Sequence, residues 1–383
     1  MKILAGINEL NFSLLNSNQI ERHSELLKEY DLSIYEYKIK ETYEYLEPWI
    51  QWPTVYSGKT AKEHKGFFLG DINSELDCIW SRGKGWFIFS PMNMRKPEDF
   101  EGVFIEDPWL GRETSSYPFK SIFSIIRSNE KLIDLKNILR FLSLIPILLI
   151  PSFKFLFSKN IKDILVSPRI FLALFLDYAV SLYILKKSKK LGLNKVHFFL
   201  NGAAHVQHRF GINERTSKAI LYFLVKSYNL YKNYSKEFIV VTGLTQENYK
   251  KETYYWKLKD FSFFHEIGIK DINFTRRMSK DLTTSFNPDL LRVLDKITIS
   301  GSNLFQYEVK DNKIYLETSF YDANPAEIEF NSINIGLIDQ WFKRIAKKEA
   351  HHVPYGFILS QADNKIENIE DIRSNLLDNF FET

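Results

Sequence analysis

The sequence is short of the residue that disulfides and thiolate clusters need. One cysteine, Cys78, occurs among 383 residues, so the chain can form no internal disulfide and no metal site built from several thiolates. The amino-terminal segment becomes polar at Asn8 and Glu9, too early for the apolar core of a secretory signal. Both features lead us to expect a cytoplasmic protein.

The sequence also lacks a strong charge of one sign. It has 51 Lys and Arg against 47 Asp and Glu, a formal net charge of +4, and the lysines are dispersed. No arginine-rich or RNP-like segment is present. We therefore expect no nucleic-acid partner.

No apolar run is long enough to cross a bilayer. The most apolar stretch, residues 141–157, is interrupted by Pro146 and Pro151, and a spanning helix needs about 20 apolar residues. Two interpretations stay open for the wider region 138–190. It is a cap packed on the core, which we favour, or a hairpin that touches an anionic membrane surface on its inner face.

Short apolar segments alternate with helical patterns along most of the chain. Strands are expected at the amino terminus and at 85–89, 102–105, 196–200, 238–242 and 356–360, a hairpin within 297–320, and helices at 12–30, 171–184, 216–231 and 337–348. Such alternation predicts an α/β fold with a mostly parallel central sheet sandwiched by helices, plus a helical cap insertion.

The same pattern divides the chain into four parts. The expected parts are a first part of the α/β core at 1–114, a helical cap at 115–192, a second part of the core at 193–362 and a peripheral acidic tail at 363–383.

Two histidines follow one of the expected strands. His205 and His208 come after the strand 196–200 and its Asn201-Gly202 turn, at the end of a strand where α/β proteins bind ligands. Residues three apart on a helical turn can face one way, so these imidazoles could share a metal ion or a phosphate. The alternative is that backbone carbonyls satisfy both rings, which is the better interpretation for an isolated pair.

Polar groups stand near three further strands. Asn8 and Glu9 follow the first strand, and such groups suit a hard cation or a hydroxylated ligand; helix capping is the alternative. His351 and His352 precede the last strand. One distant histidine brought to the pair would complete a three-imidazole Zn²⁺ site with one position open. Asp107 follows the strand 102–105 as a further candidate, or as a simple turn residue.

Glu47 begins an unusual segment. Residues 47–58 hold two prolines and two tryptophans, Trp49 and Trp52, within six positions. The segment is rigid, and Glu47 is a candidate metal ligand or base. The alternative is a capped helix start with buried tryptophans.

Taken in chain order, these segments resemble the type I phosphodiesterase and nucleotide pyrophosphatase branch of the alkaline phosphatase superfamily. Residues 57–64 resemble the stretch after that family's nucleophile, 204–208 resemble its Asp-x-x-Gln-His motif, and 352–357 resemble its last ligand segment. The resemblance implies an alkaline-phosphatase-like fold and metal-dependent chemistry on phosphate or sulfate esters.

The departures from the family pattern concern one of its two metal sites. Asn8 replaces an aspartate, Ala204 replaces another, 242–245 lack the family's Asp-His, and no Ser or Thr stands beside Glu47. One site therefore lacks most of its ligands, whereas the other keeps His208 and His352. The chain also resembles a divergent subgroup associated with surface-polysaccharide biosynthesis.

We favour an enzyme, a hydrolase or transferase with a single-metal site, acting on a phosphorylated or sulfated small molecule or sugar such as a nucleotide-sugar or polysaccharide intermediate. Metal ligands, zinc being expected, would be Glu9, His205, His208 and His352; catalytic residues would be Glu47 and His205; substrate contacts would be Asn8, Trp49, Asp107, Asn201 and His351. The alternatives are an inactive member of the fold that binds a ligand or partner, and a membrane-surface protein working through 138–190.

Overall fold

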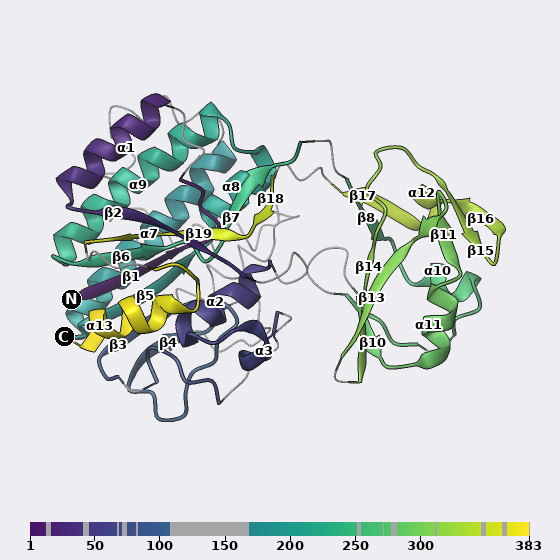
Figure 1. The fold of residues 1–383 in the computed structure, drawn as a ribbon, viewed down its shortest axis with the longest axis horizontal. Coiled ribbons are helices and arrows are strands. Elements are labelled where there is room, and N and C mark those ends of the chain that lie inside the picture. Colours follow the sequence, from purple (N-terminus) through teal and green to yellow (C-terminus); the bar gives the residue numbers. More distant parts are fainter. Residues whose placement is uncertain are drawn as a thin grey trace, which may run out of the picture. The chain divides into compact units, whose positions relative to one another are not determined.

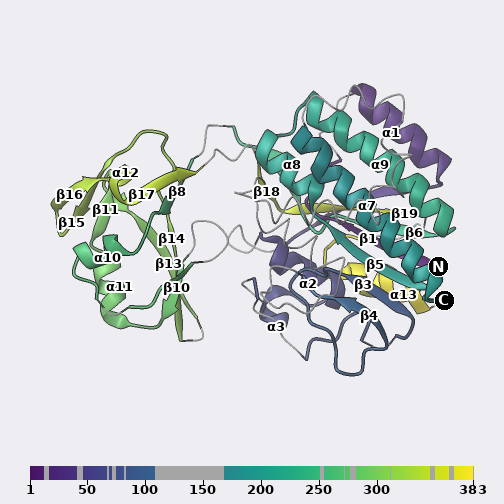
Figure 2. The same ribbon diagram turned by 180° about the vertical axis from the view of Figure 1, so that it is seen from behind.

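The computed structural model describes residues 1–12, 17–40, 46–66, 69–70, 75–81, 83–107, 168–250, 254–270, 272–276, 282–310, 312–345, 350–361 and 366–382. The chain forms two compact units (Figures 1 and 2). Unit 1 comprises Met1–Asn248 and Ala350–Thr383, and unit 2 comprises Tyr249–Glu349.

Unit 1 is built on a seven-stranded sheet in the order β2-β19-β6-β1-β5-β3-β4. The strands are β1 (Lys2–Ile7), β2 (Ser33–Lys38), β3 (Trp86–Phe89), β4 (Gly102–Ile105), β5 (Lys195–Leu200), β6 (Phe238–Val241) and β19 (Tyr355–Ser360). β1 pairs in parallel with β5 and β6, and β3 pairs in parallel with β4 and β5. β19 pairs antiparallel with both β2 and β6. The predicted α/β fold with a mostly parallel sheet is confirmed.

Helices cover both faces of this sheet (Figures 1 and 2). They are α1 (Ser17–Glu29), α2 (Pro48–Ser57), α3 (Ala61–His64), α7 (Pro168–Lys190), α8 (Gly202–Phe210), α9 (Glu214–Tyr234), the π-helix η6 (Arg373–Leu377) and α13 (Asp378–Glu382). Alternate residues of a strand face opposite sides. Ile3 and Ala5 of β1 therefore pack with α1, α7 and α9, whereas Leu4 packs with α2 and the carboxyl-terminal helices.

Unit 2 is inserted into a strand pair of unit 1. β7 (Thr245–Asn248) pairs antiparallel with β18 (Ala350–Val353), which places His352 opposite Gln246. The chain leaves for unit 2 at the end of β7 and returns at the start of β18. Antiparallel pairing brings these two ends together, so the insertion leaves the sheet of unit 1 continuous.

Unit 2 is mainly β-structure around its own core, which includes Phe263, Phe264 and Phe305. Its strands are β8 (Tyr255–Leu258), β9 (Thr275–Arg276), β10 (Leu282–Ser285), β11 (Ile297–Ile299), β12 (Ser302–Asn303), β13 (Phe305–Lys310), β14 (Lys313–Thr318), β15 (Glu327–Phe330), β16 (Ile333–Leu337) and β17 (Phe342–Ile345), and its helices are α10 (Ser262–Glu266), α11 (Pro288–Leu294) and α12 (Ile338–Trp341). β13 and β14 form the hairpin expected within 297–320.

Three expectations about organisation need correction. The stretch 193–362 is not one piece of core, because 249–349 form unit 2. The tail is not peripheral, because apolar residues three or four apart, including Ile366, Ile369 and Ile372, are buried against the sheet. The expected helix at 337–348 ends at Trp341, where β17 pairs with β8 instead.

Most of the expected cap, residues 115–167, lies outside the described residues, as do residues 108–114 of the expected first core part. The described remainder of the cap is mainly α7, which packs in the core of unit 1 through residues such as Leu174 and Phe175. Among the described residues, no helix has the length and apolar content needed to span a membrane.

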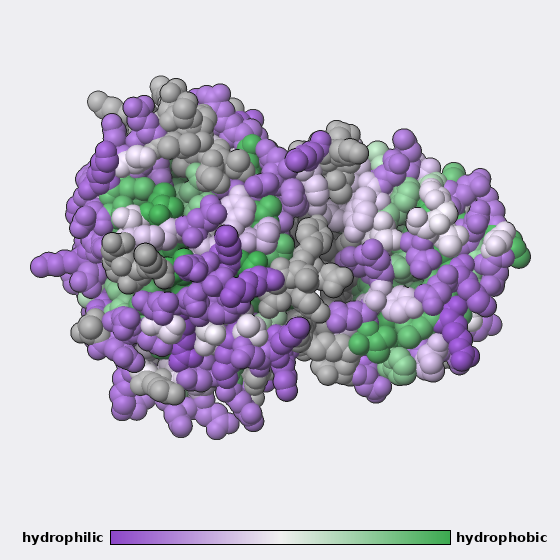
Figure 3. All heavy atoms as spheres, in the orientation of Figure 1, coloured by the Kyte–Doolittle hydropathy of each residue, from purple (hydrophilic) through white to green (hydrophobic). Residues whose placement is uncertain are grey.

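The surface view in Figure 3 is largely hydrophilic on the displayed face of each unit. The large hydrophobic side chains that are exposed in the described residues are Leu191 in unit 1 and Phe286, Val309, Tyr321, Ile333 and Leu337 in unit 2.

Candidate metal centre

Glu9 lies in the turn that follows the central strand β1. The backbone N–H of Asn8 donates to the carbonyl of Leu200 (2.9 Å), and that of Glu9 donates to the carbonyl of Thr242 (2.9 Å). The ends of β5 and β6 therefore fix the turn from both sides. Glu9 has a φ of 58°, a left-handed conformation that non-glycine residues adopt rarely and that is often found at functional sites.

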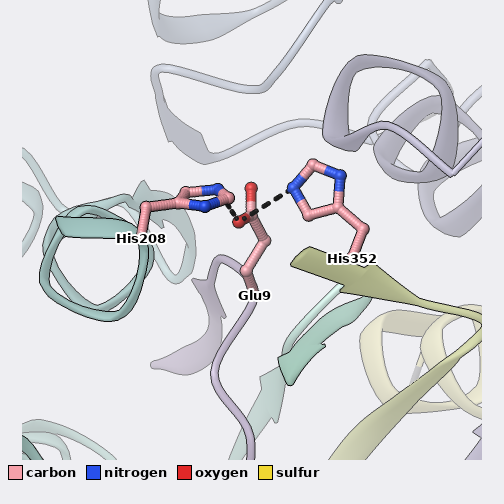
Figure 4. A group of neighbouring side chains, drawn as sticks. All are labelled: Glu9, His208 and His352. Atoms are coloured by element: carbon pink, nitrogen blue, oxygen red, sulfur yellow. Dashed lines mark ion pairs between the residues drawn. The ribbon is translucent and has the colours of Figure 1, made fainter. Parts of the chain in front are cut away.

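The Glu9 carboxylate is buried between two imidazoles (Figure 4). Its Oε2 lies 2.8 Å from Nε2 of His208 and 3.1 Å from Nε2 of His352. Its Oε1 accepts a hydrogen bond from Nδ2 of Asn8 (2.7 Å). Burial alone would raise the pKa of Glu9, but the two histidines outweigh it and hold that pKa well below its usual value. The carboxylate is thus kept ionised.

Backbone carbonyls orient both imidazoles. Nδ1 of His208 lies 3.3 Å from the carbonyl of Ala350, and Nδ1 of His352 lies 2.7 Å from the carbonyl of Leu46. An Nδ1–H that donates to a carbonyl leaves Nε2 of the same ring directed at Glu9. Metal-ligating histidines are typically held in this way.

Glu9, His208 and His352 form a group that can hold a metal ion. Their ligand atoms all lie within 4.8 Å of one another, a spacing that one ion with bonds of about 2.0–2.2 Å can bridge. The residues come from the turn after β1, from α8 and from β18. The side chains of His208 and His352 are 24% and 13% exposed, whereas that of Glu9 is 3% exposed, so the two rings form the more exposed side of the group.

His205 does not belong to this group, contrary to the expected three-imidazole site. Three residues turn an α-helix by about 300°, which leaves His205 and His208 about 60° apart around α8. His205 is exposed, and its Nε2 lies 3.3 Å from Nδ2 of Asn201. The described structure gives the third place to the carboxylate of Glu9.

The other expected histidine, His351, also faces away from Glu9. His351 and His352 are neighbours on β18, and consecutive residues of a strand point to opposite faces. The residue opposite His351 on β7 is Glu247. His351 therefore has no described contact with the metal group.

Glu47 lies beside the group at the start of α2, where it is the N-cap residue. Its Oε2 is 3.5 Å from Nδ1 of His352, and its side chain is 37% exposed. The segment 47–58 forms a helix start close to the alternative interpretation, with Pro48 in its first turn and Trp52 fully buried, although the side chain of Glu47 makes no capping hydrogen bond. Trp49 is partly buried against the core, and its carbonyl accepts from Nδ2 of Asn93 (3.0 Å).

Asn8 supports Glu9 instead of facing an open site. Its Nδ2 donates to Glu9 and to Oδ1 of Asn201 (2.8 Å), and its Oδ1 accepts from Nε1 of Trp52 (2.7 Å). All of these groups lie at or beside the carboxyl ends of β1 and β5. Asn8 is 1% exposed, so it acts as a positioning residue for the carboxylate.

Asp107 is buried after β4 and belongs to another cluster. Burial, and to a lesser degree the charge of Asp107, raises the pKa of Tyr56. The hydroxyl of Tyr56 in turn lies 3.0 Å from Nε2 of His197. Asp107 is not part of the metal group.

Three residues that were not among the expected site residues complete the surroundings. Nε2 of Gln207 donates to the carbonyl of Glu9 (2.7 Å), Nε2 of Gln246 donates to its Oε2, and Trp52 holds Asn8. Gln207 stands inside the His-x-Gln-His motif, which is a signal for its role. Gln246 carries no such signal, because only the pairing of β7 with β18 brings it to the group.

No protein-family model matches the chain. No curated protein matches its sequence either.

Solved structures resemble the chain over nearly its whole length. Murine ectonucleotide pyrophosphatase/phosphodiesterase 5 is 9% identical, with a TM-score of 0.48 over 97% of this chain and 92% of that one. Phosphonoacetate hydrolase from Sinorhizobium meliloti 1021, in complex with phosphonoformate, is 10% identical, with a TM-score of 0.43 over 97% and 93%.

Proposed function

We propose that this protein is a metal-dependent hydrolase or transferase of phosphate or sulfate esters that works with a single divalent cation. The observation that carries the proposal is the convergence of Glu9, His208 and His352 beside the carboxyl ends of parallel strands. In open α/β sheets that edge is where ligands bind. Three protein donors leave a position for a substrate oxygen.

The donor set fits Zn²⁺, the cation that we propose. One carboxylate and two imidazoles form a common ligand set of catalytic zinc, and each imidazole is oriented by a carbonyl. Such an ion supplies Lewis-acid polarisation of a phosphoryl or sulfuryl oxygen.

Glu47 is the group that we propose as general base. Its carboxylate lies 3.5 Å from His352 and is 37% exposed, so it is near the metal group and open to solvent. The proton of that hydroxyl passes to Glu47, the oxygen forms the new bond to phosphorus or sulfur, and the leaving oxygen departs with its electron pair. The first residues of α2 include no Ser or Thr, and the later hydroxyls of Thr54 and Ser57 are buried and donate to carbonyls of the same helix, so we propose direct transfer without a covalent intermediate.

Trp52 supports the use of one cation instead of two. In the family that the motifs resemble, a second ion uses residues at the positions of Asn8 and 242–245. Here Nε1 of Trp52 donates to Asn8. A Cβ on Gly243 would lie 2.6 Å from that same indole nitrogen, so the indole fills the space between these two segments.

The substrate class that we propose follows the motif resemblance. It is a phosphorylated or sulfated small molecule or sugar, such as a nucleotide-sugar or a polysaccharide intermediate.

Hydrolysis of chromogenic phosphodiester, phosphomonoester and sulfate esters, measured with added Zn²⁺, tests the proposal. We expect turnover by the intact chain and a loss of about 10²–10⁴-fold in Glu47→Gln, the usual size of a general-base effect. Glu214→Gln is the matched control, because Glu214 is an exposed carboxylate at the start of α9.

Two outcomes would contradict the proposal. Equal rates for Glu47→Gln and the unchanged chain would remove Glu47 from the mechanism. Tight Zn²⁺ binding without turnover of any ester would assign the site to ligand binding, the alternative favoured by the missing hydroxyl nucleophile.

A further inference from the structure

Gln246 lies at the metal group because of strand pairing. It is fully buried in β7 and stands directly opposite His352 of β18. Directly opposite residues of an antiparallel pair project to the same face. The backbone carbonyl of Gln246 accepts from Nδ2 of Asn11 (2.7 Å), which fixes the strand at this point.

Only the nitrogen of the Gln246 side-chain amide makes a hydrogen bond among the described residues. Its Nε2 donates to Oε2 of Glu9, the same oxygen that faces both imidazoles. Its Oε1 is buried and has no hydrogen-bond donor among the described residues. Buried side-chain oxygens nearly always have a partner, so this acceptor is the unexplained atom of the site.

A cation would supply that partner. An amide oxygen and an amide NH₂ have almost the same shape, so rotation of the terminal amide presents oxygen where nitrogen now lies. Amide oxygens are good ligands for divalent cations, as carboxylates are. We propose that Oε1 of Gln246 is a fourth protein ligand of the cation, an inference that rests on the proposed function.

A neutral fourth ligand has a consequence for substrate choice. One carboxylate, two neutral imidazoles and one amide leave a divalent cation with a net charge of +1, which favours an anionic ester oxygen in a fifth position, a coordination number that catalytic zinc can reach. A carboxylate in place of the amide would cancel that charge. Gln246 would thus strengthen cation binding without weakening the attraction for an anionic substrate.

Titration calorimetry of the chelator-treated full chain with ZnCl₂ tests the inference. In Gln246→Leu we expect the Kd for Zn²⁺ to rise by about 100-fold or more, because a ligand is lost, whereas removal of an outer partner of a metal site costs about 10–100-fold. Gln246→Glu restores an oxygen ligand, so its Kd should equal or fall below that of the unchanged chain. Gln361→Leu is the control. Gln361 follows the end of β19 that is farther from His352, and its Nε2 donates to the carbonyl of Tyr30 instead of to the metal group.

Gln246→Glu separates ligation from simple hydrogen bonding. If Gln246 only donates to Glu9, the glutamate brings repulsion instead of a donor, and its Kd should rise as much as that of Gln246→Leu. That result, or unchanged Kd values in both variants, would overturn the inference. If the unchanged chain itself bound no Zn²⁺, the proposed function would fail first. Melting temperatures of the metal-free variants show whether each one folds.

Discussion

Glu9 connects the fold to the site at the scale of single residues. Its backbone extends the hydrogen bonding of β1 to the ends of β5 and β6. Its carboxylate accepts hydrogen bonds from the side chains of Asn8 and Gln246 and forms ion pairs with His208 and His352. An ionised carboxylate of this kind, buried at 3% exposure, is stable only with such partners. A bound cation would stabilise the charge of this carboxylate, as the two imidazoles do in the structure.

His205 and His208 form a matched pair for mutation on one helix. His208→Ala removes a ligand, so we expect its Kd for Zn²⁺ to rise by more than about 100-fold, beyond the range for outer partners. His205→Ala should leave that Kd within about threefold, a change below 1 kcal/mol. Calorimetry gives both values. Equal losses in the two variants would show that His205 is also a ligand.

The sequence indicated part of the site at this scale. Glu9, His208 and His352 each follow or precede an expected strand, and strand ends meet at one edge of a sheet, so their convergence was predictable. The exclusion of His205 was not, because the packing of α8 decides which of the two histidines faces Glu9. The position of Gln246 depends on pairing between strands that are about a hundred residues apart in the sequence.

At the scale of elements, the contact between α7 and α8 sets the position of His208. The N–H of Gly202, the first residue of α8, donates to Oδ2 of Asp177 on α7 (2.7 Å). A Cβ on Gly202 would lie 2.6 Å from that Oδ2 and 2.8 Å from the carbonyl of Ala173. Only glycine allows the two helices to approach so closely.

Gly202→Ala should therefore destabilise the protein and disturb the site together. We expect a loss of about 1–3 kcal/mol in unfolding free energy, as for overpacked contacts, with weaker Zn²⁺ binding because α8 must shift. Urea denaturation and calorimetry measure the two effects. Gly192→Ala gives the cost of backbone strain alone for comparison, because Gly192, unlike Gly202, has a positive φ (69°) and has no heavy atom within 4 Å of its Cβ position. An unchanged stability of Gly202→Ala would show that the helix contact tolerates a methyl group.

Helices and strands could be predicted where a long apolar pattern lies within one continuous segment of the sequence. The helix around 171–184 and the strands around 196–200 and 238–242 are observed with modest changes in length. The helix expected at 337–348 is observed only as far as Trp341. Its apolar spacing also suits a strand, and pairing of β17 with β8, about 87 positions earlier, decides the outcome.

At the scale of the whole molecule, buried histidines make stability depend on pH. Burial lowers the pKa of His23 to about 4 and that of His197 to about 3. Both rings are neutral in the folded chain and take up protons more readily when it unfolds. Their contribution is complete above pH 6.5 and is lost as the pH falls from 6.5 toward those values.

His23→Phe isolates one of these contributions. His23 stacks on Phe12, with ring centroids 5.2 Å apart, so an aromatic ring is a close replacement. Between pH 6 and 4.5 we expect the unfolding free energy of the unchanged chain to fall more steeply than that of the variant, by up to about 1.4 kcal/mol per pH unit. Denaturation curves at several pH values measure the slopes. Parallel slopes would mean that His23 already binds a proton in the folded chain.

The division into two units lay beyond sequence reasoning. Residues 249–349 contain strand and helix patterns much like those of the α/β core, and no linker composition marks their limits. We expected the carboxyl-terminal segment to be peripheral because it is acidic. Its apolar residues Ile366, Ile369 and Leu376 are nevertheless buried in the core of unit 1.

Metal content is the measurement that tests the central claim most directly. The full chain is incubated with Zn²⁺, dialysed and analysed for bound metal, next to Glu9→Gln, which keeps the shape of the side chain and removes its charge. The unchanged chain should retain one Zn²⁺ per molecule and gain thermal stability from it, and Glu9→Gln should retain almost none. No stoichiometric metal in the unchanged chain, or equal metal in both proteins, would contradict a cation site at Glu9, His208 and His352.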